Sequence, residues 1–189
     1  MAIFTARLER AVVRVLQGRG PAPPKDGPAA QAAAHGVTVA LILSRYSDDE
    51  DVLIAGLLLD ALQDPTAAEA LEREFGPRVV GMIRGVAEPL RELPWGTRTA
   101  RYLRRLSSTP NPSLLVASAD VIATLIALIG AREAPGGEGG LRFGGPIEEQ
   151  LRLARGVYEA VRGSWPRCPL LPELRKRLEE AERKLLRRP

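Results

Sequence analysis

Three polar side chains that could ligate a metal interrupt apolar stretches of the sequence. Asp60 follows three leucines, Asp120 interrupts the long apolar run 114–131, and His35, the only histidine, lies in a third segment with few charges. A charged group is costly to bury unless a partner or a metal compensates it. We therefore expect the three segments to share one polar pocket.

A second carboxylate, Asp64, follows Asp60 by four residues, the spacing that places two side chains on one face of an α-helix. A mixed set of histidine and carboxylates suits Mn, Fe or Zn, and such an ion could activate a water molecule to attack phosphorus. Neutralisation of the carboxylates by arginine is the alternative, with candidates Arg84, Arg98 and Arg101. Spacing alone leaves both interpretations open.

Other chemistries have few candidates. The sequence contains no P-loop, no C-x-x-C, no H-E-x-x-H and no G-x-S-x-G motif. Cys168 is the only cysteine, so an intramolecular disulfide and a structural zinc site with four soft ligands are both excluded. The single thiol fits a cytoplasmic location, and Cys168 itself is interpreted as an incidental residue in a turn.

The periodicity of the apolar residues is helical almost throughout and predicts an all-α protein with about eight to nine helices. Length favours a single domain over 1–189. Proline and glycine interrupt the pattern, and a break at 75–77 is expected to separate two helices. The predicted helices are 3–17, 29–45, about 50–63, 67–74, 77–88, 95–108, 112–132, 147–163 and 170–187.

Charge and hydropathy limit the partners. The 27 basic and 23 acidic residues are mixed along the chain, which gives a net charge of +4 and no strong nucleic-acid signal. The run 114–131 approaches membrane-span length. Because Ser118, Asp120 and Thr124 lie inside it, we interpret it as a buried central helix and expect no membrane insertion. The oligomeric state is open, and a homo-oligomer is compatible with the sequence.

The segment 35–88 resembles a known family in residue types and in intervals. Its characteristic blocks are His35 with the apolar residues after it, Ile54–Asp64, Phe75–Val80 and Arg84–Pro89, and 102–120 fits the same pattern. These blocks are similar to the HD-domain metal-dependent phosphohydrolases, and specifically to the ppGpp hydrolase domain of the RelA/SpoT enzymes. The resemblance covers about 30–165, implies an HD-domain-like helical bundle and leaves 170–187 as an added helix packed on it.

The resemblance assigns roles by position. It implies that His35, Asp60 and Asp120 correspond to metal ligands and that the histidine of the family's His-Asp pair has become Leu59. The family's catalytic Glu-Asp pair falls on Gln63 and Asp64, which leaves Asp64 as the candidate catalytic residue. After Asp120 the family's basic residue, histidine and asparagine are replaced by residues of the run 121–124, with Thr124 at the asparagine position.

These departures lead to two hypotheses. The first is an HD-domain homologue with an eroded metal site, catalytically inactive and with no cofactor, which serves as a binding or interaction module. The alternative is a divergent metal-dependent phosphohydrolase that uses Mn, Fe or Zn on a nucleotide or pyrophosphate substrate. A nucleotide or another phosphate-bearing small molecule is the expected partner in either case. A further idea is that arginines of 95–108 contact phosphate: Arg98, Arg101, Arg104 and Arg105.

Overall fold

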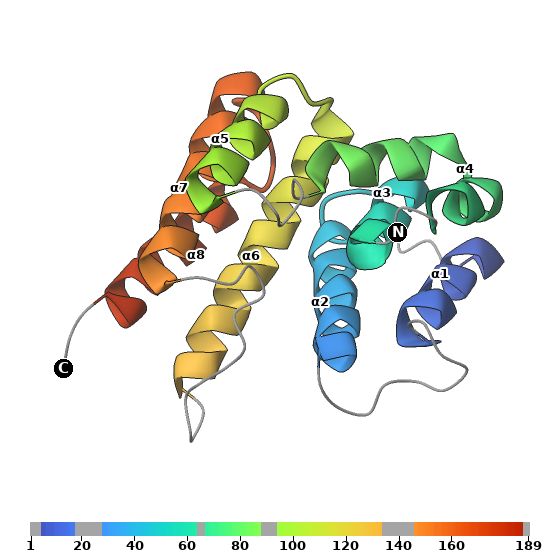
Figure 1. The fold of residues 1–189 in the computed structure, drawn as a ribbon, viewed down its shortest axis with the longest axis horizontal. Helices are drawn as coiled ribbons and strands as arrows, with labels where there is room; N and C mark the ends of the chain where they lie inside the picture. Colours follow the sequence, from blue (N-terminus) through green and yellow to red (C-terminus); the bar gives the residue numbers. More distant parts are fainter. Residues whose placement is uncertain (1–4, 18–27, 64–66, 88–93, 134–145, 187–189) are drawn as a thin grey trace. The chain divides into compact units, whose positions relative to one another are not determined.

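The computed structural model describes residues 5–17, 28–63, 67–87, 94–133 and 146–186. Within these ranges all regular structure is helical and no strand is present, which confirms the all-α prediction (Figure 1). The elements are α1 (Ala6–Gln17), α2 (Pro28–Leu43), α3 (Glu50–Leu57), the 3₁₀ helix η1 (Leu59–Gln63), α4 (Ala67–Val86), α5 (Trp95–Leu106), α6 (Asn111–Glu133), α7 (Ile147–Ser164) and α8 (Leu171–Leu185).

The chain groups into two compact units, Met1–Glu88 with α1 to α4 and Pro89–Pro189 with α5 to α8. Each unit has its own set of packed helices. In the first unit α3 contacts α1, α2 and α4, and in the second α8 packs on α6 and α7 while α5 packs on α7. The single domain over 1–189 stays a prediction.

Two glycines allow α2 and α3 to approach closely. A Cβ atom added to Gly36 would collide with the carbonyl oxygen of Leu57 and would lie 3.3 Å from its carbonyl carbon. A Cβ added to Gly56 would lie 2.5 Å from Cδ1 of Leu43 and 3.1 Å from Cγ1 of Val39. Each helix therefore contributes one glycine to the seam between them; a side chain at Gly36 would meet backbone, whereas one at Gly56 would meet the side chains of Leu43 and Val39.

The α-helix that was expected to continue to Gln63 ends earlier. Leu57 is the last residue of α3, Leu58 has φ −94° and ψ 15°, and the chain then continues as η1. The amide of Ala61 donates to the carbonyl of Leu58 at 2.8 Å, an i to i+3 bond. Tightening of this kind is common at the ends of α-helices. The prediction of one α-helix through Gln63 is therefore wrong at its end.

The break expected at 75–77 is present. Gly76 has φ 83° and ψ 162°, a conformation that residues with a Cβ rarely adopt, and it divides α4 into two helical segments. Pro77 directly follows, where the missing amide hydrogen costs the second segment nothing. The buried face of α4 includes Leu71, Phe75, Val79 and Ile83 on both sides of the break.

Acidic residues at the start of α3 connect three helices of the first unit. Asp49 is the N-cap of α3 and accepts from the amide of Asp51. Arg78 of α4 contacts Asp49 at 2.5 Å and Asp51 at 2.8 Å, while Arg7 of α1 contacts Glu50 at 2.9 Å and Asp51 at 2.6 Å. The sequence shows acids suited to a helix N-terminus, but their ion pairs depend on the packing of α1 and α4.

In the second unit α6 is the most apolar helix, and it is long enough to cross a membrane. Of its most apolar window, 78% is buried inside the protein, as in the core helix of a globular protein. Ser118 and Thr124, two of the uncharged polar residues within its buried stretch, donate to carbonyls of their own helix, Leu114 at 2.8 Å and Asp120 at 2.9 Å. The structure thus agrees with the interpretation of α6 as a buried helix.

Candidate metal centre

His35 lies on α2, directly before the glycine that touches α3. The side chain is buried, with a relative exposure of 9%. Because Gly36 rests on the backbone of Leu57, the turn of α2 that carries His35 is fixed against the end of α3. The sequence places a potential metal ligand at this position, and the packing of α2 on α3 and η1 holds it there.

Leu59 and Asp60 open the 3₁₀ helix that follows α3. Leu59 is 7% exposed and ends the buried run 52–59, whereas Asp60 is half-buried. Both residues lie in the first unit together with His35, and α2 contacts η1. At the position of the family's second histidine the structure therefore places a buried alkyl side chain without any donor atom.

The catalytic pair predicted from the resemblance is only partly described. Gln63 is the last residue of η1, and Asp64, the candidate catalytic residue, lies outside the described residues. The argument that Asp60 and Asp64 share a face assumed an α-helix. Since Asp60 lies on a 3₁₀ helix, where residues i and i+3 are aligned, that argument no longer supports a common face.

Asp120 lies in the second unit, in the middle of α6, and is 4% exposed. Its backbone carbonyl accepts a hydrogen bond from Oγ1 of Thr124 at 2.9 Å. Thr124, at the position of the family's asparagine, is 6% exposed, and its hydroxyl thus bonds within its own helix. The replacement of asparagine by Thr124 therefore puts a short side chain engaged with the backbone where the family carries an amide.

Thr124 also borders a small internal cavity of the second unit. The cavity has a volume of about 10 Å³, roughly the space for one water molecule. Tyr102 of α5 and Gln150 of α7 join Thr124 as the polar side chains around it, and the rest of the lining is aliphatic. A cavity of this size cannot hold a nucleotide, so it contributes no substrate pocket.

The donor atoms at the positions that the resemblance assigns to the metal site are divided between the two units. In the first unit His35 and Asp60 carry donors, and Leu59 carries none. Among the described residues no group of three or more His, Cys, Asp or Glu side chains comes together as a metal ion would require. Asp120 belongs to the second unit, so the three-ligand remnant stays a prediction.

Of the arginines considered as partners for these carboxylates, Arg84 shares the first unit with Asp60 and is exposed on α4. Arg98 and Arg101 lie on α5 in the second unit, where the guanidinium of Arg98 stacks on Trp95, 4.8 Å from the centre of the ring. Neutralisation of Asp60 by arginine therefore remains a prediction.

A family model for the HD domain matches residues 23–129, more than half of the chain. The chain is an HD-domain protein. The match begins before His35 and ends after Thr124, so it includes every residue that the sequence resemblance assigned to the site. HD domains of this kind are generally metal-dependent and related to phosphohydrolases.

Solved structures share the fold of this HD-domain protein. A metazoan ortholog of SpoT that hydrolyses ppGpp and plays a role in starvation responses matches with a TM-score of 0.69 and 23% identity over 97% of both chains. The protein lmo0812 from Listeria monocytogenes EGD-e matches with a TM-score of 0.66 and 23% identity, over 79% of this chain and 99% of that one. No curated protein sequence matches the chain.

The burial of Cys168 was not expected from its place in a turn. Cys168 is 3% exposed, and its sulfur lies 4.0 Å from the hydroxyl of Ser118 on α6. Burial raises the pKa of the Cys168 thiol above its usual value, against the opposing effect of hydrogen bonds from nearby backbone and from Ser118. Cys168 is therefore an unreactive packing residue of the second unit, and its position between Arg167 and Pro169 gave no sign of burial.

Proposed function

We propose that this HD-domain protein is a non-catalytic binding or interaction module that keeps the family fold and has lost the family's metal chemistry. Leu59 carries the proposal. It occupies the position of a metal-binding histidine, it is buried, and an alkyl group offers a metal nothing to coordinate. A partial set of ligands binds metal weakly, since affinity depends on the number and type of donors.

Two further replacements support the same conclusion. Gln63 stands where the family has a glutamate, so a carboxylate that would orient a metal-bound water is missing. Thr124 stands where the family has an asparagine, and its hydroxyl bonds to its own helix. Loss of a ligand, an acid and an amide at three positions that the resemblance assigns to the family's site, while the helices that carry them remain packed within each unit, is the pattern of a scaffold retained without its reaction.

The partner that fits this proposal is a phosphate-bearing small molecule such as a nucleotide. The family acts on phosphate esters, and an HD domain without its metal can keep the binding surface of a substrate while it leaves the bond intact. Binding of a nucleotide without release of phosphate is the expected behaviour.

The test combines elemental analysis with restoration of the lost ligand. The wild-type protein, purified after growth with Mn, Fe and Zn, should contain far less than one metal per chain. Leu59→His should gain metal, because His35 and Asp60 remain on the same unit. The double variant Leu59→His with His35→Ala is the matched control and should lose that gain.

The alternative is a divergent metal-dependent phosphohydrolase, favoured by the three positions of the family's ligand set that survive: His35, Asp60 and Asp120. It predicts near-stoichiometric metal in the wild-type protein. It also predicts phosphate or pyrophosphate release from a nucleotide panel with Mn, lost in Asp60→Ala and Asp120→Ala. Either result would refute the non-catalytic proposal.

A further inference from the structure

Many acidic and basic side chains of this protein form ion pairs within their own unit. The basic residues of α8 pair with acids: Arg177 with Glu173 and Glu180, and Lys184 with Glu133 and Glu180. The acids at the start of α3 are likewise bound to arginines of their own unit. A surface whose basic residues have no acidic partner departs from this pattern.

Helix α5 is such a surface. Its twelve residues include four arginines and no acid. No ion pair joins Arg98, Arg101 or Arg104 to another described residue, whereas the exposed Arg175 of α8 has Glu179 as its partner. Arg101 and Arg104 are exposed and Arg98 is half-buried, so the three guanidinium groups line the outer side of the helix.

This arrangement works against the stability of α5 itself. Arg98 lies in the first turn, where the positive end of the helix dipole disfavours a cation. Arg101 is three residues from both Arg98 and Arg104, and like charges at this spacing repel each other across the helix surface. Helix formation therefore does not account for these arginines, and an anion that binds the outer side would relieve the repulsion.

We propose that the outer side of α5 binds the phosphate backbone of a nucleic acid. Guanidinium groups bind phosphate oxygens in a two-pronged geometry. Arg98 to Arg104 span about 9 Å along the helix axis. That length matches two to three successive phosphates of a strand with an axial rise of about 3.4 Å.

The neighbours of the arginines favour this partner over a small molecule. Gly96, Thr97 and Ala100 are exposed and small, so the face is open and a long backbone can approach it closely. Small-molecule sites, in contrast, enclose most of their ligand. The open face of α5 would enclose only a small part of the surface of a single nucleotide.

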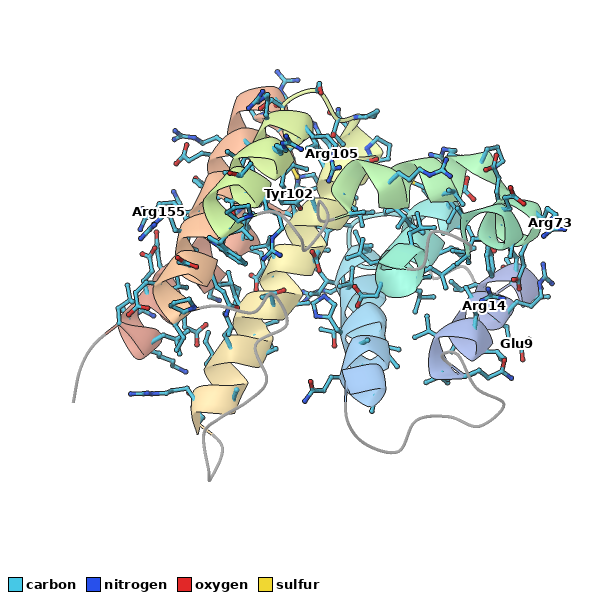
Figure 2. All side chains as sticks on the ribbon, viewed as in Figure 1. Glu9, Arg14, Arg73, Tyr102, Arg105 and Arg155 are labelled. Carbon is cyan, nitrogen blue, oxygen red and sulfur yellow. The ribbon has the colours of Figure 1, made fainter. Side chains whose placement is uncertain are left out.

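The same neighbours argue against a protein or a membrane as the occupant. Protein interfaces need a buried apolar or aromatic centre, and peripheral membrane helices need an apolar face beside the basic one. None of the exposed large apolar side chains of the described chain belongs to α5. The aromatic residues Trp95 and Tyr102 are half-buried and buried, and each lies beneath an arginine, Arg98 and Arg105 respectively. Figure 2 shows Tyr102 and Arg105 on α5.

The test measures binding of a fluorescently labelled RNA oligonucleotide to the full chain by anisotropy across a series of salt concentrations. The triple variant Arg98→Gln, Arg101→Gln, Arg104→Gln should bind at least about tenfold more weakly, and the slope of log K against log salt should fall by about 2. The control triple variant Arg73→Gln, Arg132→Gln, Arg175→Gln removes the same charge from exposed positions on α4, α6 and α8. Figure 2 shows Arg73 at the outer edge of α4.

The control variant should change the affinity by less than about threefold, since it removes no charge from α5. Three outcomes would overturn the proposal: no binding of RNA at low salt, an equal loss in both triple variants, or binding that depends on α5 for poly-glutamate but not for RNA. Circular dichroism establishes that both variants fold. Should the triple variant unfold, the single variant Arg101→Gln replaces it and should lower the salt slope by about 0.7.

Discussion

Arg78 of α4 binds the N-cap residue of α3, Asp49, through both of its terminal nitrogens, with Nη2 to Oδ2 at 2.5 Å and Nη1 to Oδ1 at 2.9 Å. The same carboxylate accepts from the amide of Asp51. The Asp49 side chain thus caps the N-terminus of α3 and also binds the segment of α4 that follows the break at Gly76. This double use makes the start of α3 the most informative place to test the stability of the first unit.

Removal of the arginine should destabilise the first unit modestly. Arg78 is half exposed, so Arg78→Gln should lower the free energy of unfolding by about 0.5–1 kcal/mol. Asp49→Ala should cost about 1 kcal/mol more, because the N-cap bond is lost together with the ion pair. Urea unfolding followed by circular dichroism measures both values. Arg45→Gln, at another exposed arginine of the first unit, is the control and should cost almost nothing; an equal loss there would contradict the assignment.

The same contacts predict how stability depends on pH. Hydrogen bonding to Arg78 lowers the pKa of Asp49 below its usual value of 3.8, although burial opposes this, and hydrogen bonds from Thr5 and Arg7 lower the pKa of Glu50. A carboxyl whose pKa is lower in the folded state stabilises the fold above its unfolded pKa. That stability is lost as the pH falls through the folded value.

We therefore expect the urea midpoint to fall as the pH is lowered below about 4. Arg78→Gln should fall less steeply over the same range, because Asp49 would then titrate near its unfolded pKa. Parallel curves for wild-type and Arg78→Gln proteins would show that the ion pair does not contribute.

The seam between α2 and α3 predicts opposite effects for two glycine substitutions. Gly36→Ala should destabilise by about 1–3 kcal/mol, because the new methyl group would meet the carbonyl of Leu57. Gly81→Ala on α4 should stabilise by about 0.5–1 kcal/mol, since nothing lies within 4 Å of the added Cβ and alanine favours the helix. Both are measured by urea unfolding. A stabilising Gly36→Ala would mean that the two helices do not approach as described.

The buried thiol predicts a kinetic signature. Cys168 should react with a thiol reagent far more slowly in the native protein than in urea, because the side chain is enclosed and burial raises its pKa. The native rate should follow local or global opening of the second unit. Rapid labelling under native conditions would contradict the burial of Cys168 against α6.

Local pattern was enough to predict most of the fold. Apolar periodicity located the helices, and Phe75-Gly76-Pro77 marked the break that the positive φ of Gly76 produces. The end of α3 was not predictable in the same way. The leucines before Asp60 are equally compatible with an α-helix and with a 3₁₀ helix, so the change at Leu58 could not be read from residue types.

For the candidate site, the sequence names residues but does not specify their environment, and the roles of these residues stay a prediction. Resemblance to a family located His35, Leu59, Asp60 and Asp120, and the family match covers all four. The hydrogen bond from the Thr124 hydroxyl to the backbone carbonyl of Asp120 depends on the rotamer of Thr124, which the spacing of residues in the sequence does not specify. The ion pairs of Arg78 depend on how α4 packs against α3, a relationship between residues almost 30 positions apart.

The glycine seam has a consequence for attempts to rebuild catalysis by directed evolution. Position 59 can be varied in a library, because a substitution there changes one side chain and leaves the seam between α2 and α3 unchanged. Gly36 offers none, since an added Cβ would meet the backbone carbonyl of Leu57, whereas a Cβ at Gly56 would meet the flexible end of the Leu43 side chain. A search that holds Gly36 constant would explore new ligands on an intact frame, whereas a search that randomises it would lower the stability of its variants before any new ligand is assayed.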